Sequence, residues 1–249
     1  MTQDSKRPFT ARSVLASGLL GMDPPELPVA QLIRLTSLFG LSENRARVAL
    51  SRMVATGEVT TDGAGCYRLA GRLAERQARQ SASRSGRTLT YRGDWHLVMV
   101  TTSGSSAEVR TTRRRALAYA RLSELREGVW MRPANIDLHL HDGVGADLEV
   151  MTARPEDALE LVDRLWDLAA WSARATELLD QMRALRPEQP GDLAPGFELS
   201  AAVLRHLQAD PLLPDPLLPA AWPGAALRRD YDTWDARYRT TLRTWSRAD

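Results

Sequence analysis

The stretch that most constrains the fold is residues 41–57, a short basic helix with a signal at each end. Ser42 is a good N-cap, because its hydroxyl accepts one of the unpaired backbone N–H groups of the next turn. Gly57 suits the far end, where the chain leaves the helix through a left-handed residue. At 100° per residue, the apolar side chains fall on one side, which we expect to face a core: Ala46, Ala49, Leu50, Met53 and Val54.

The other side of this helix is small, polar and basic. Asn44, Val48 and Ser51 are central on it, and arginines flank them at Arg45, Arg47 and Arg52. A short helix of this kind suits reading of the DNA major groove. An ordinary amphipathic helix with a solvated basic face has the same composition. The neighbouring segments separate the two interpretations.

Three helices and a hairpin are predicted in residues 10–69. Helical spacing covers residues 10–21 and 29–39 on either side of a proline-rich break. After the basic helix, two β-prone runs at residues 58–61 and 66–69 flank a glycine-rich turn. This order predicts a winged helix–turn–helix domain in residues 1–80, with Arg68 on the hairpin placed to contact phosphate.

Charge is distributed unevenly along the chain. Residues 1–92 contain 14 Lys or Arg against 7 Asp or Glu, and the remainder contains 19 against 24. A basic N-terminal part favours a polyanionic partner, so the expected partner is double-stranded DNA. The alternative, a winged-helix domain used only for protein contacts, does not explain this excess.

Length and composition set wider limits. The 249 residues suffice for two or three small domains, and the 43% hydrophobic content is ordinary for a globular protein. No apolar run approaches the roughly 20 residues of a membrane span, and no signal-like segment follows the N-terminus. The single Cys66 fits a reducing compartment. We therefore expect a cytoplasmic protein without membrane contact or cofactor.

A linker at residues 81–92 is expected to lead into a central domain at residues 93–184. Strands are predicted at 94–100, 128–132, 136–141 and 147–151, a helix at 111–122, and one or two helices across 155–182. The order β-α-β-β-α, with a further edge strand, predicts a ferredoxin-like α/β sandwich.

Two clusters in the central domain could carry chemistry. His139 and His141 share one face of a predicted strand next to Asp142, but no further Cys or His completes a metal set, and exposed strand histidines are the favoured interpretation. Thr111-Thr-Arg-Arg-Arg115 is expected to open a helix. Its arginines, Arg113, Arg114 and Arg115, are either simply solvated or meet a phosphate-bearing partner.

The C-terminal segment, residues 185–249, is predicted to be mainly helical. Helices at 197–209 and 225–245 flank a segment stiffened by five prolines between Pro211 and Pro223. The last helix carries an aromatic stripe that indicates a packed core or a dimer seam. A ligand interpretation stays open, because Trp222, Arg228 and Arg229 suit an aryl group with a charged tail. The chain is thus predicted to be an α+β protein.

Several motifs are shared with one family. These are Arg47, Ser51 and Arg52 followed by Gly57; Gly93-Asp-Trp-His-Leu-Val98; Gly128-Val-Trp-Met-Arg-Pro133; Trp166-Asp-Leu168; and the run from Asp210-Pro to Trp222-Pro-Gly224. Together they span nearly the whole chain in the order of the phenylacetate-degradation repressor (PaaX) family, which the sequence resembles. The chain departs at Leu204-Arg-His-Leu-Gln208, where the family tends to carry an extra Trp-Arg pair.

The resemblance implies a homodimeric transcriptional regulator, usually a repressor of aromatic-acid catabolism. It implies release by an acyl-CoA thioester such as phenylacetyl-CoA. A dimer would place two copies of the basic helix about one helical turn apart, so the expected operator is pseudo-palindromic. From the helix face and the hairpin, the expected DNA-contacting residues are Asn44, Arg45, Arg47, Val48, Ser51, Arg52 and Arg68. The expected effector residues are Arg113, Arg114, Arg115, Trp222, Arg228 and Arg229.

An enzyme is the competing hypothesis. The central domain also resembles the ferredoxin-like fold of small CRISPR-associated nucleases, which hold metal through an Asp at the end of their first strand. Here that strand ends Val100-Thr-Thr-Ser103, with no carboxylate. Neither a nucleophile–base pair nor a glycine-rich phosphate loop is found in the sequence, so a metal-dependent ribonuclease is disfavoured and no catalytic or metal-binding residue is predicted.

Overall fold

The computed structural model describes residues 9–102, 104–140 and 147–247, which combine helices with two small antiparallel sheets in an α+β fold. The chain forms two compact units. Unit 1 consists of residues 1–84, 178–205 and 229–249, and unit 2 consists of residues 85–177 and 206–228. The predicted boundaries at residues 80, 92 and 184 follow sequence segments, and they stay predictions.

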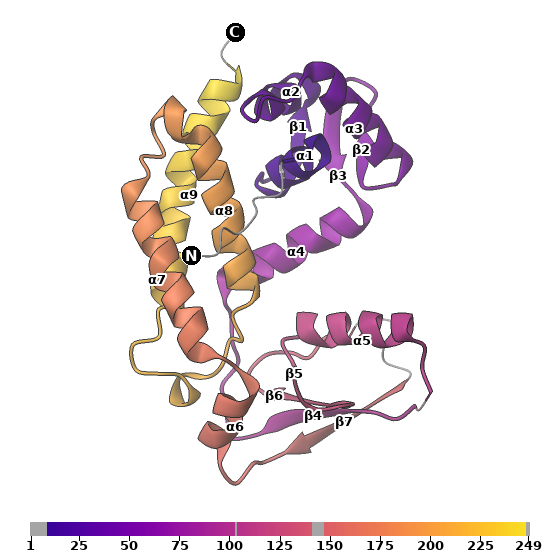
Figure 1. Ribbon diagram of the computed structural model, residues 1–249, viewed down its shortest axis with the longest axis vertical. Helices are drawn as coiled ribbons and strands as arrows, with labels where there is room; N and C mark the ends of the chain where they lie inside the picture. Colours follow the sequence, from indigo (N-terminus) through magenta and orange to yellow (C-terminus); the bar gives the residue numbers. More distant parts are fainter. Residues whose placement is uncertain (1–8, 103, 141–146, 248–249) are drawn as a thin grey trace, which may run out of the picture. The chain divides into compact units, whose positions relative to one another are not determined.

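The N-terminal part of unit 1 contains three helices and a three-stranded sheet (Figure 1). The helices are α1 (Ala11–Leu20), α2 (Val29–Ser37) and α3 (Glu43–Ala55). The strands are β1 (Glu26–Pro28), β2 (Val59–Thr61) and β3 (Cys66–Leu69), in the order β1-β3-β2. Their apolar side chains form one core around Leu15, Leu19, Leu32, Leu50 and Met53. Burial of these apolar side chains is the main favourable contribution to folding of the N-terminal part of unit 1.

Two details of this part differ from the sequence prediction. Strand β1 lies in the proline-rich break, where Glu26 and Pro28 pair antiparallel with Arg68 and Cys66. As the end residue of an edge strand, Pro28 needs no N–H for the ladder. Val54 is exposed rather than inward, because Ala46, Leu50 and Met53 already define the buried side of α3.

Helix α4 (Gly71–Ser85) is longer than expected. It continues through residues 81–85, which we predicted to belong to a linker, and Gly86 follows in the left-handed region. Serines are weak helix formers but are tolerated where a helix is held by packing. Here Ser83 is buried, and Arg84 pairs with Asp232 (2.5 Å) and Asp235 (2.7 Å).

The rest of unit 1 is helical. It takes α7 (Leu168–Ala184) from Leu178 on, α8 (Leu193–Gln208) up to Arg205 and α9 (Gly224–Arg247) from Arg229 on, with a short turn, η2 (Pro190–Asp192), before α8. On α9, Tyr231, Trp234 and Tyr238 are buried, as the packed-core interpretation predicts. The Tyr238 hydroxyl donates to the Leu193 carbonyl (3.0 Å), which fixes α9 against the start of α8.

Unit 2 is built on a four-stranded antiparallel sheet in the order β5-β6-β4-β7. The strands are β4 (Trp95–Val100), β5 (Ser123–Arg126), β6 (Val129–Pro133) and β7 (Leu148–Ala153). Helix α5 (Ala107–Tyr119) runs along one face of this sheet, and α6 (Ala158–Leu165) follows β7 (Figure 1).

The two faces of the sheet have separate cores. Val98 and Trp130 pack with Leu117 of α5 on one side. Trp95 and Met131 pack on the other side with α6 and with Leu213 and Leu217 of the proline-rich segment. That segment combines the turn η3 (Asp215–Leu217), Leu212 in the left-handed region and a turn closed by the Trp222 N–H on the Pro219 carbonyl (2.9 Å), in line with the extended or turn geometry that its five prolines predict.

Three boundaries in unit 2 correct the prediction. Residues 136–140 are not a strand; Leu138 and Leu140 pack on the α5 side without a pairing partner in the described residues, and His141 lies outside those residues. The strand instead occurs earlier, at β5, whose pairing with β6 contains a bulge near Glu124. Helix α5 begins at Ala107 rather than Thr111, because Ser106 caps it by accepting from the Val109 N–H (3.3 Å).

Candidate nucleic-acid interface and ligand cavity

Helix α3 presents the polar and basic side that its spacing predicts. Its N-terminus is capped by Ser42, whose hydroxyl accepts from the Arg45 N–H, and Gly57 leaves the helix with φ +69°. While Ala46, Leu50 and Met53 are buried, the predicted DNA-contacting residues of the helix are all exposed: Asn44, Arg45, Arg47, Val48, Ser51 and Arg52. Val48 is 43% exposed, an apolar side chain among polar ones, as contact with a thymine methyl group would require.

Two of the predicted arginines form ion pairs. Arg47 pairs with Glu43 one turn earlier (2.7 Å), and both side chains are more than half exposed. On the hairpin, Arg68 pairs with Glu26 across β1 and β3, with Nε 2.8 Å from the carboxylate. Hydrogen bonding to Glu26 raises the pKa of Arg68, so its charge is secure. Exposed pairs of this kind are worth little and exchange readily for another anion.

The tip of the hairpin is acidic rather than basic. The Asp62 carboxylate accepts from the backbone N–H groups of Ala64 (2.8 Å) and Cys66 (3.0 Å), which closes the turn. These hydrogen bonds lower the pKa of Asp62. Any phosphate contact of the hairpin therefore falls on its strands, where Arg68 is, and not on its tip.

The predicted effector residues divide into two places. Arg113 and Arg114 line a cavity of about 440 Å³ between α5 and the ends of β4, β5 and β6. Arg115 is exposed on α5 and does not line this cavity, and neither do Trp222, Arg228 or Arg229. The structure thus does not bring the predicted set together in one pocket.

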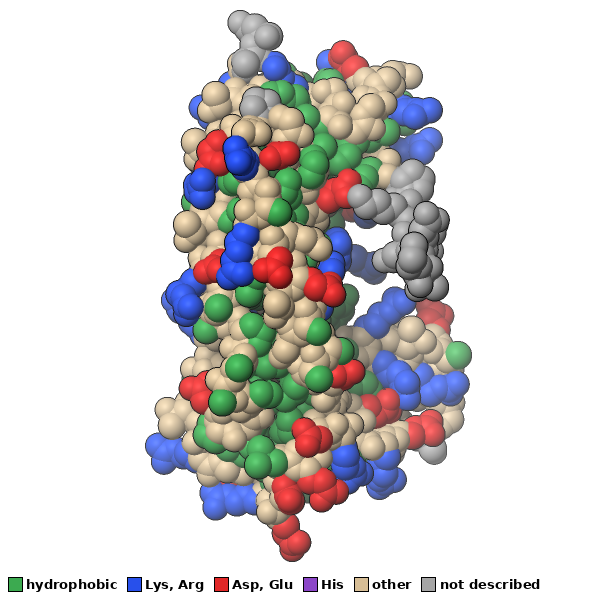
Figure 2. Space-filling model, turned by 60° about the vertical axis from the view of Figure 1, so that its left-hand side comes forward, with side chains coloured by type: hydrophobic (Ala, Val, Ile, Leu, Met, Phe, Trp, Pro, Cys, Tyr) green, Lys and Arg blue, Asp and Glu red, His purple; other side chains and the backbone are tan. Residues whose placement is uncertain are grey.

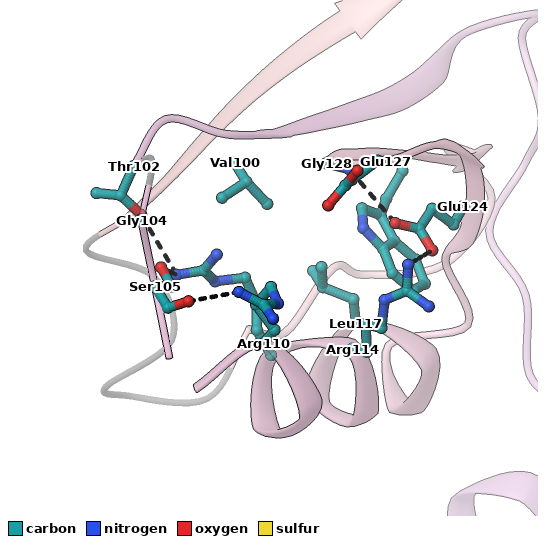
Figure 3. Close-up of a pocket in the computed structure, with 12 residues that line it drawn as sticks. Val100, Thr102, Gly104, Ser105, Arg110, Arg114, Leu117, Glu124, Glu127 and Gly128 are labelled. Carbon is teal, nitrogen blue, oxygen red and sulfur yellow. Dashed lines mark hydrogen bonds and ion pairs between the residues drawn. The ribbon is translucent and has the colours of Figure 1, made fainter. Parts of the chain in front are cut away.

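The α5 cavity is lined by charged and apolar side chains (Figure 3). Arg113, only 7% exposed, pairs with Asp147 (3.0 Å) and donates to the hydroxyls of Thr102 and Ser105. Arg114 pairs with Glu124 (2.8 Å). We did not predict Arg110, a further lining residue, because the helix was expected to start after it. The i, i+3, i+4 spacing of Arg110, Arg113 and Arg114 is the sequence signal that identifies this face.

Trp222 is part of an aromatic stack in unit 2. Its ring stacks on Trp171 (4.4 Å between centroids), which also stacks on His206 (4.2 Å). Trp171 and His206 exchange hydrogen bonds through their rings and backbone carbonyls: His206 Nε2–H donates to the Trp171 carbonyl at 3.0 Å, and Trp171 Nε1–H donates to the His206 carbonyl at 3.3 Å. These contacts assign Trp222 a packing role for one ring face.

Arg228 belongs to a buried charged cluster around Asp210. It pairs with the Asp210 carboxylate (2.8 Å), while Arg121 donates to the Asp210 carbonyl. Nearby, fully buried Arg132 donates to Asn135 (2.9 Å) and to the Leu212 carbonyl. Desolvation lowers the pKa of Arg121 to about 10 and that of Arg132 to about 9. Arg229, the next residue, is exposed.

The described residues contain few features of a metal site or a membrane-spanning helix. Within them, no group of three or more His, Cys, Asp or Glu side chains is placed to hold a metal ion. His139 is exposed, and its predicted partners His141 and Asp142 lie outside these residues. None of the described helices combines the length and apolar character that crossing a membrane needs.

Acidic and basic side chains are equal in number on α7 and α8, and ion pairs also form around α9. Arg183 pairs with Asp180 on α7 (3.0 Å), and Arg237 of α9 pairs with Glu188. The face shown in Figure 2 accordingly carries basic and acidic side chains interspersed along its length. Helix α9 carries six arginines against three aspartates, so an excess of arginine is not confined to residues 1–92.

Comparison with known proteins gives two family matches and, among solved structures, a protein of similar fold and sequence. The PaaX-like protein family matches residues 10–73, and the PaaX-like protein C-terminal domain matches residues 166–247. Among solved structures, the uncharacterized protein Rv0674 from Mycobacterium tuberculosis is 42% identical, with a TM-score of 0.76 over 95% of this chain and 98% of that one. No curated protein matches the sequence.

Proposed function

The chain belongs to the PaaX-like family of transcriptional regulators, and we propose that it represses a catabolic operon and leaves DNA when an acyl-CoA of the phenylacetyl-CoA type binds. The observation that carries this proposal is the exposed side of α3, where every predicted DNA-contacting side chain of that helix is free of the core. The second unit supplies a ligand cavity and two clusters of polar and aromatic groups, as a ligand-controlled regulator requires.

Residues 1–80 act in this proposal as a winged helix–turn–helix domain. The order α1-β1-α2-α3-β2-β3 supports it, since α3 then follows α2 through a short turn and the β2–β3 hairpin forms the wing. For residues 93–184 we propose a ferredoxin-like sandwich, supported by the order β-α-β-β at its start and by the antiparallel pairing of all four strands.

In the proposed complex α3 lies in the major groove. Asn44, Val48 and Ser51 face the bases, and Arg45 or Arg47 hydrogen-bonds guanine. Arg52 and Arg68 contact phosphates, which adds affinity without sequence choice. A homodimer places two copies of α3 about one helical turn apart, so the operator is pseudo-palindromic.

Control requires that the effector bind the two states of the protein with different affinity. The proposed effector residues are Arg113, Arg114, Arg115, Trp222, Arg228 and Arg229. Of these, Arg113, Arg114 and Arg228 are held by carboxylates and Trp222 by stacking. Ligand binding at these positions would exchange existing contacts and so change the geometry of unit 2.

A gel-shift titration with the protein's own upstream DNA tests DNA reading. Arg47→Ala should weaken binding of the operator by about 1–3 kcal/mol and relax sequence choice, because one base contact is lost. Arg243→Ala, which removes an exposed arginine from α9, is the matched control and should bind like the wild type. No retardation of upstream DNA at low salt would sink the proposal.

A further inference from the structure

The side of α5 that faces the sheet carries arginines where a packed helix usually carries apolar residues. Arg110, Arg113, Arg114 and Leu117 recur at the spacing of one helix face. Leu117 is fully buried and packs with Val98 and Trp130, which shows that this face is the inward one. Arg113 is nine-tenths buried on the same face. Arg110 and Arg114 on the same face are exposed, so of these three arginines it is Arg113 that needs partners to offset its desolvation.

The three guanidinium groups differ in how they are satisfied. Arg113 is held by Asp147 and Arg114 by Glu124. Among the described residues, the acceptor that Arg110 meets is the Ser105 carbonyl, at 2.6 Å. A guanidinium has five N–H donors, so Arg110 keeps donors for a further acceptor in the cavity.

The cavity has a polar end and an apolar middle (Figure 3). Thr102, Ser105 and Arg110 lie at one end, and Glu124 and Glu127 lie at the other. Between them the walls are Val100 and Leu117, with buried Trp130 also lining the cavity. A ligand that fits has an anionic group at the Arg110 end and an apolar body along Leu117 and Trp130.

We propose that this cavity binds a small free monocarboxylate, whose carboxylate accepts a bidentate pair of hydrogen bonds from Arg110 and whose apolar body lies against Leu117 and Trp130. Planar guanidinium and carboxylate groups match in geometry. Asp147 and Glu124 already pair with Arg113 and Arg114, and Glu127 also lines the cavity. A single negative charge on the ligand is therefore favoured over a doubly charged phosphate.

This ligand is distinct from the acyl-CoA effector proposed above, although Arg113 and Arg114 line this cavity and are also among the proposed effector residues. A thioester carbonyl is neutral and cannot replace the carboxylate at Arg110. The cavity volume, about 440 Å³, is also near the lower end of small-molecule pockets, which suits a single ring or a short chain and not a whole coenzyme A. The proposal stands independently of DNA binding.

Isothermal titration calorimetry of the full chain without DNA tests it. The probes are hexanoate and benzoate, their neutral amides hexanamide and benzamide, and inorganic phosphate. We expect both carboxylates to bind, and the amides and phosphate to bind at least about tenfold more weakly, since charge-assisted hydrogen bonds are lost or repulsion is added. Glu127→Gln, which removes a negative charge from the far end, should bind the carboxylates as tightly as the wild type or more tightly.

Two arginine variants give the matched comparison. Arg110→Ala should weaken hexanoate binding at least about tenfold, whereas Arg164→Ala, which removes an exposed arginine of α6 outside the cavity, should leave it unchanged. Circular dichroism melting of both variants checks that they fold. Equal binding of acid and amide, tighter binding of phosphate, equal loss in both variants, or no binding of either carboxylate would overturn the proposal. Because DNA is absent, such a failure leaves the regulator proposal untouched.

Discussion

At the residue scale, ion pairing divides the arginines into those that are committed to the fold and those that are available. Arg228 and Arg113 have carboxylate partners and are largely buried, whereas Arg45 and Arg52 are exposed on α3. Exposure of the α3 residues could be predicted, because helix periodicity alone decides which side is outward. Burial of Arg113 could not, because it depends on Asp147, a partner 34 residues away.

Arg68 is predicted to contact DNA phosphate, but in the absence of DNA its side chain is hydrogen-bonded to Glu26. The phosphate would have to compete with that carboxylate. Glu26→Gln keeps the shape of the side chain and removes its charge. If Arg68 contacts phosphate, DNA affinity at low salt should rise about twofold to tenfold, because the protein no longer competes with the phosphate.

Fluorescence anisotropy over a salt series measures this change. The same substitution at Glu75, which pairs with Arg79 on α4, is the control and should have a smaller effect. The loss of folding stability should stay under about 1 kcal/mol, because the Arg68–Glu26 pair is exposed. Unchanged DNA affinity of Glu26→Gln would show that Arg68 does not contact DNA.

His206 gives a pH-dependent prediction. Burial lowers the pKa of its ring below the ordinary 6.5, with a smaller opposing effect of its hydrogen bond to Trp171. The folded chain therefore holds this proton more weakly than the unfolded chain, so unfolding takes up a proton and stability falls as pH drops below 6.5. Above that pH, the neutral ring contributes its full stacking on Trp171.

Melting curves between about pH 7.5 and 5 check the His206 effect. Wild type should lose more melting temperature over this range than His206→Gln, whose amide N–H still reaches the Trp171 carbonyl but cannot be protonated. His139→Gln, which changes an exposed histidine, should follow the wild type. Parallel pH profiles for all three proteins would show that His206 does not control acid stability.

At the element scale, the sequence predicts the helices and turns that have strong local signals, but it does not predict a strand that forms only through pairing with a distant strand. The caps and spacing of α3 and the turn between β2 and β3 are local, so both elements could be predicted from their own residues. Strand β5 could not, because Ser123-Glu-Leu-Arg126 is polar and is a strand only through its pairing with β6. Residues 136–140 show the converse: their alternation reflects packing of Leu138 and Leu140, not a ladder.

Close contact between α1 and α2 depends on one small residue. A Cβ added at Gly18 would lie 2.2 Å from Cδ2 of Leu35, which is itself buried. Gly18→Ala should therefore destabilise unit 1 by about 1–3 kcal/mol through overpacking, despite the better helix propensity of alanine.

Urea unfolding measures this cost. Gly191→Ala is the matched control, since a Cβ there meets no atom within 4 Å, and it should leave the unfolding midpoint unchanged. Equal stability of Gly18→Ala and wild type would mean that α1 and α2 are less closely packed than described.

At the scale of the whole molecule, the family models match an N-terminal and a C-terminal segment, and the similarity to Rv0674 also covers most of the segment between them. The family matches leave residues 74–165 uncovered, whereas the match to Rv0674 covers 95% of this chain. The similarity to Rv0674 therefore extends over most of residues 74–165, which include the sheet of unit 2. The proposed DNA-contacting residues are in unit 1 and the α5 cavity is in unit 2. The effect of a ligand on DNA affinity therefore has to be measured on the full chain.

Reciprocity between DNA and effector is the whole-molecule prediction. If phenylacetyl-CoA lowers operator affinity by a given factor, bound operator must lower phenylacetyl-CoA affinity by the same factor, because both describe one coupling free energy. A factor of roughly 5 to 150 is expected, which corresponds to about 1–3 kcal/mol. Anisotropy of labelled operator with and without ligand gives one value, and calorimetry of the ligand with and without operator gives the other.

Free coenzyme A is the control for the acyl group, and it should change neither affinity. If saturating phenylacetyl-CoA binds the protein but leaves operator affinity unchanged, it has equal affinity for both states and is not the effector, however tightly it binds. Operator affinity measured with and without hexanoate separates the two proposed ligands. If hexanoate changes the operator affinity, DNA binding responds to a free acid as well as to the thioester.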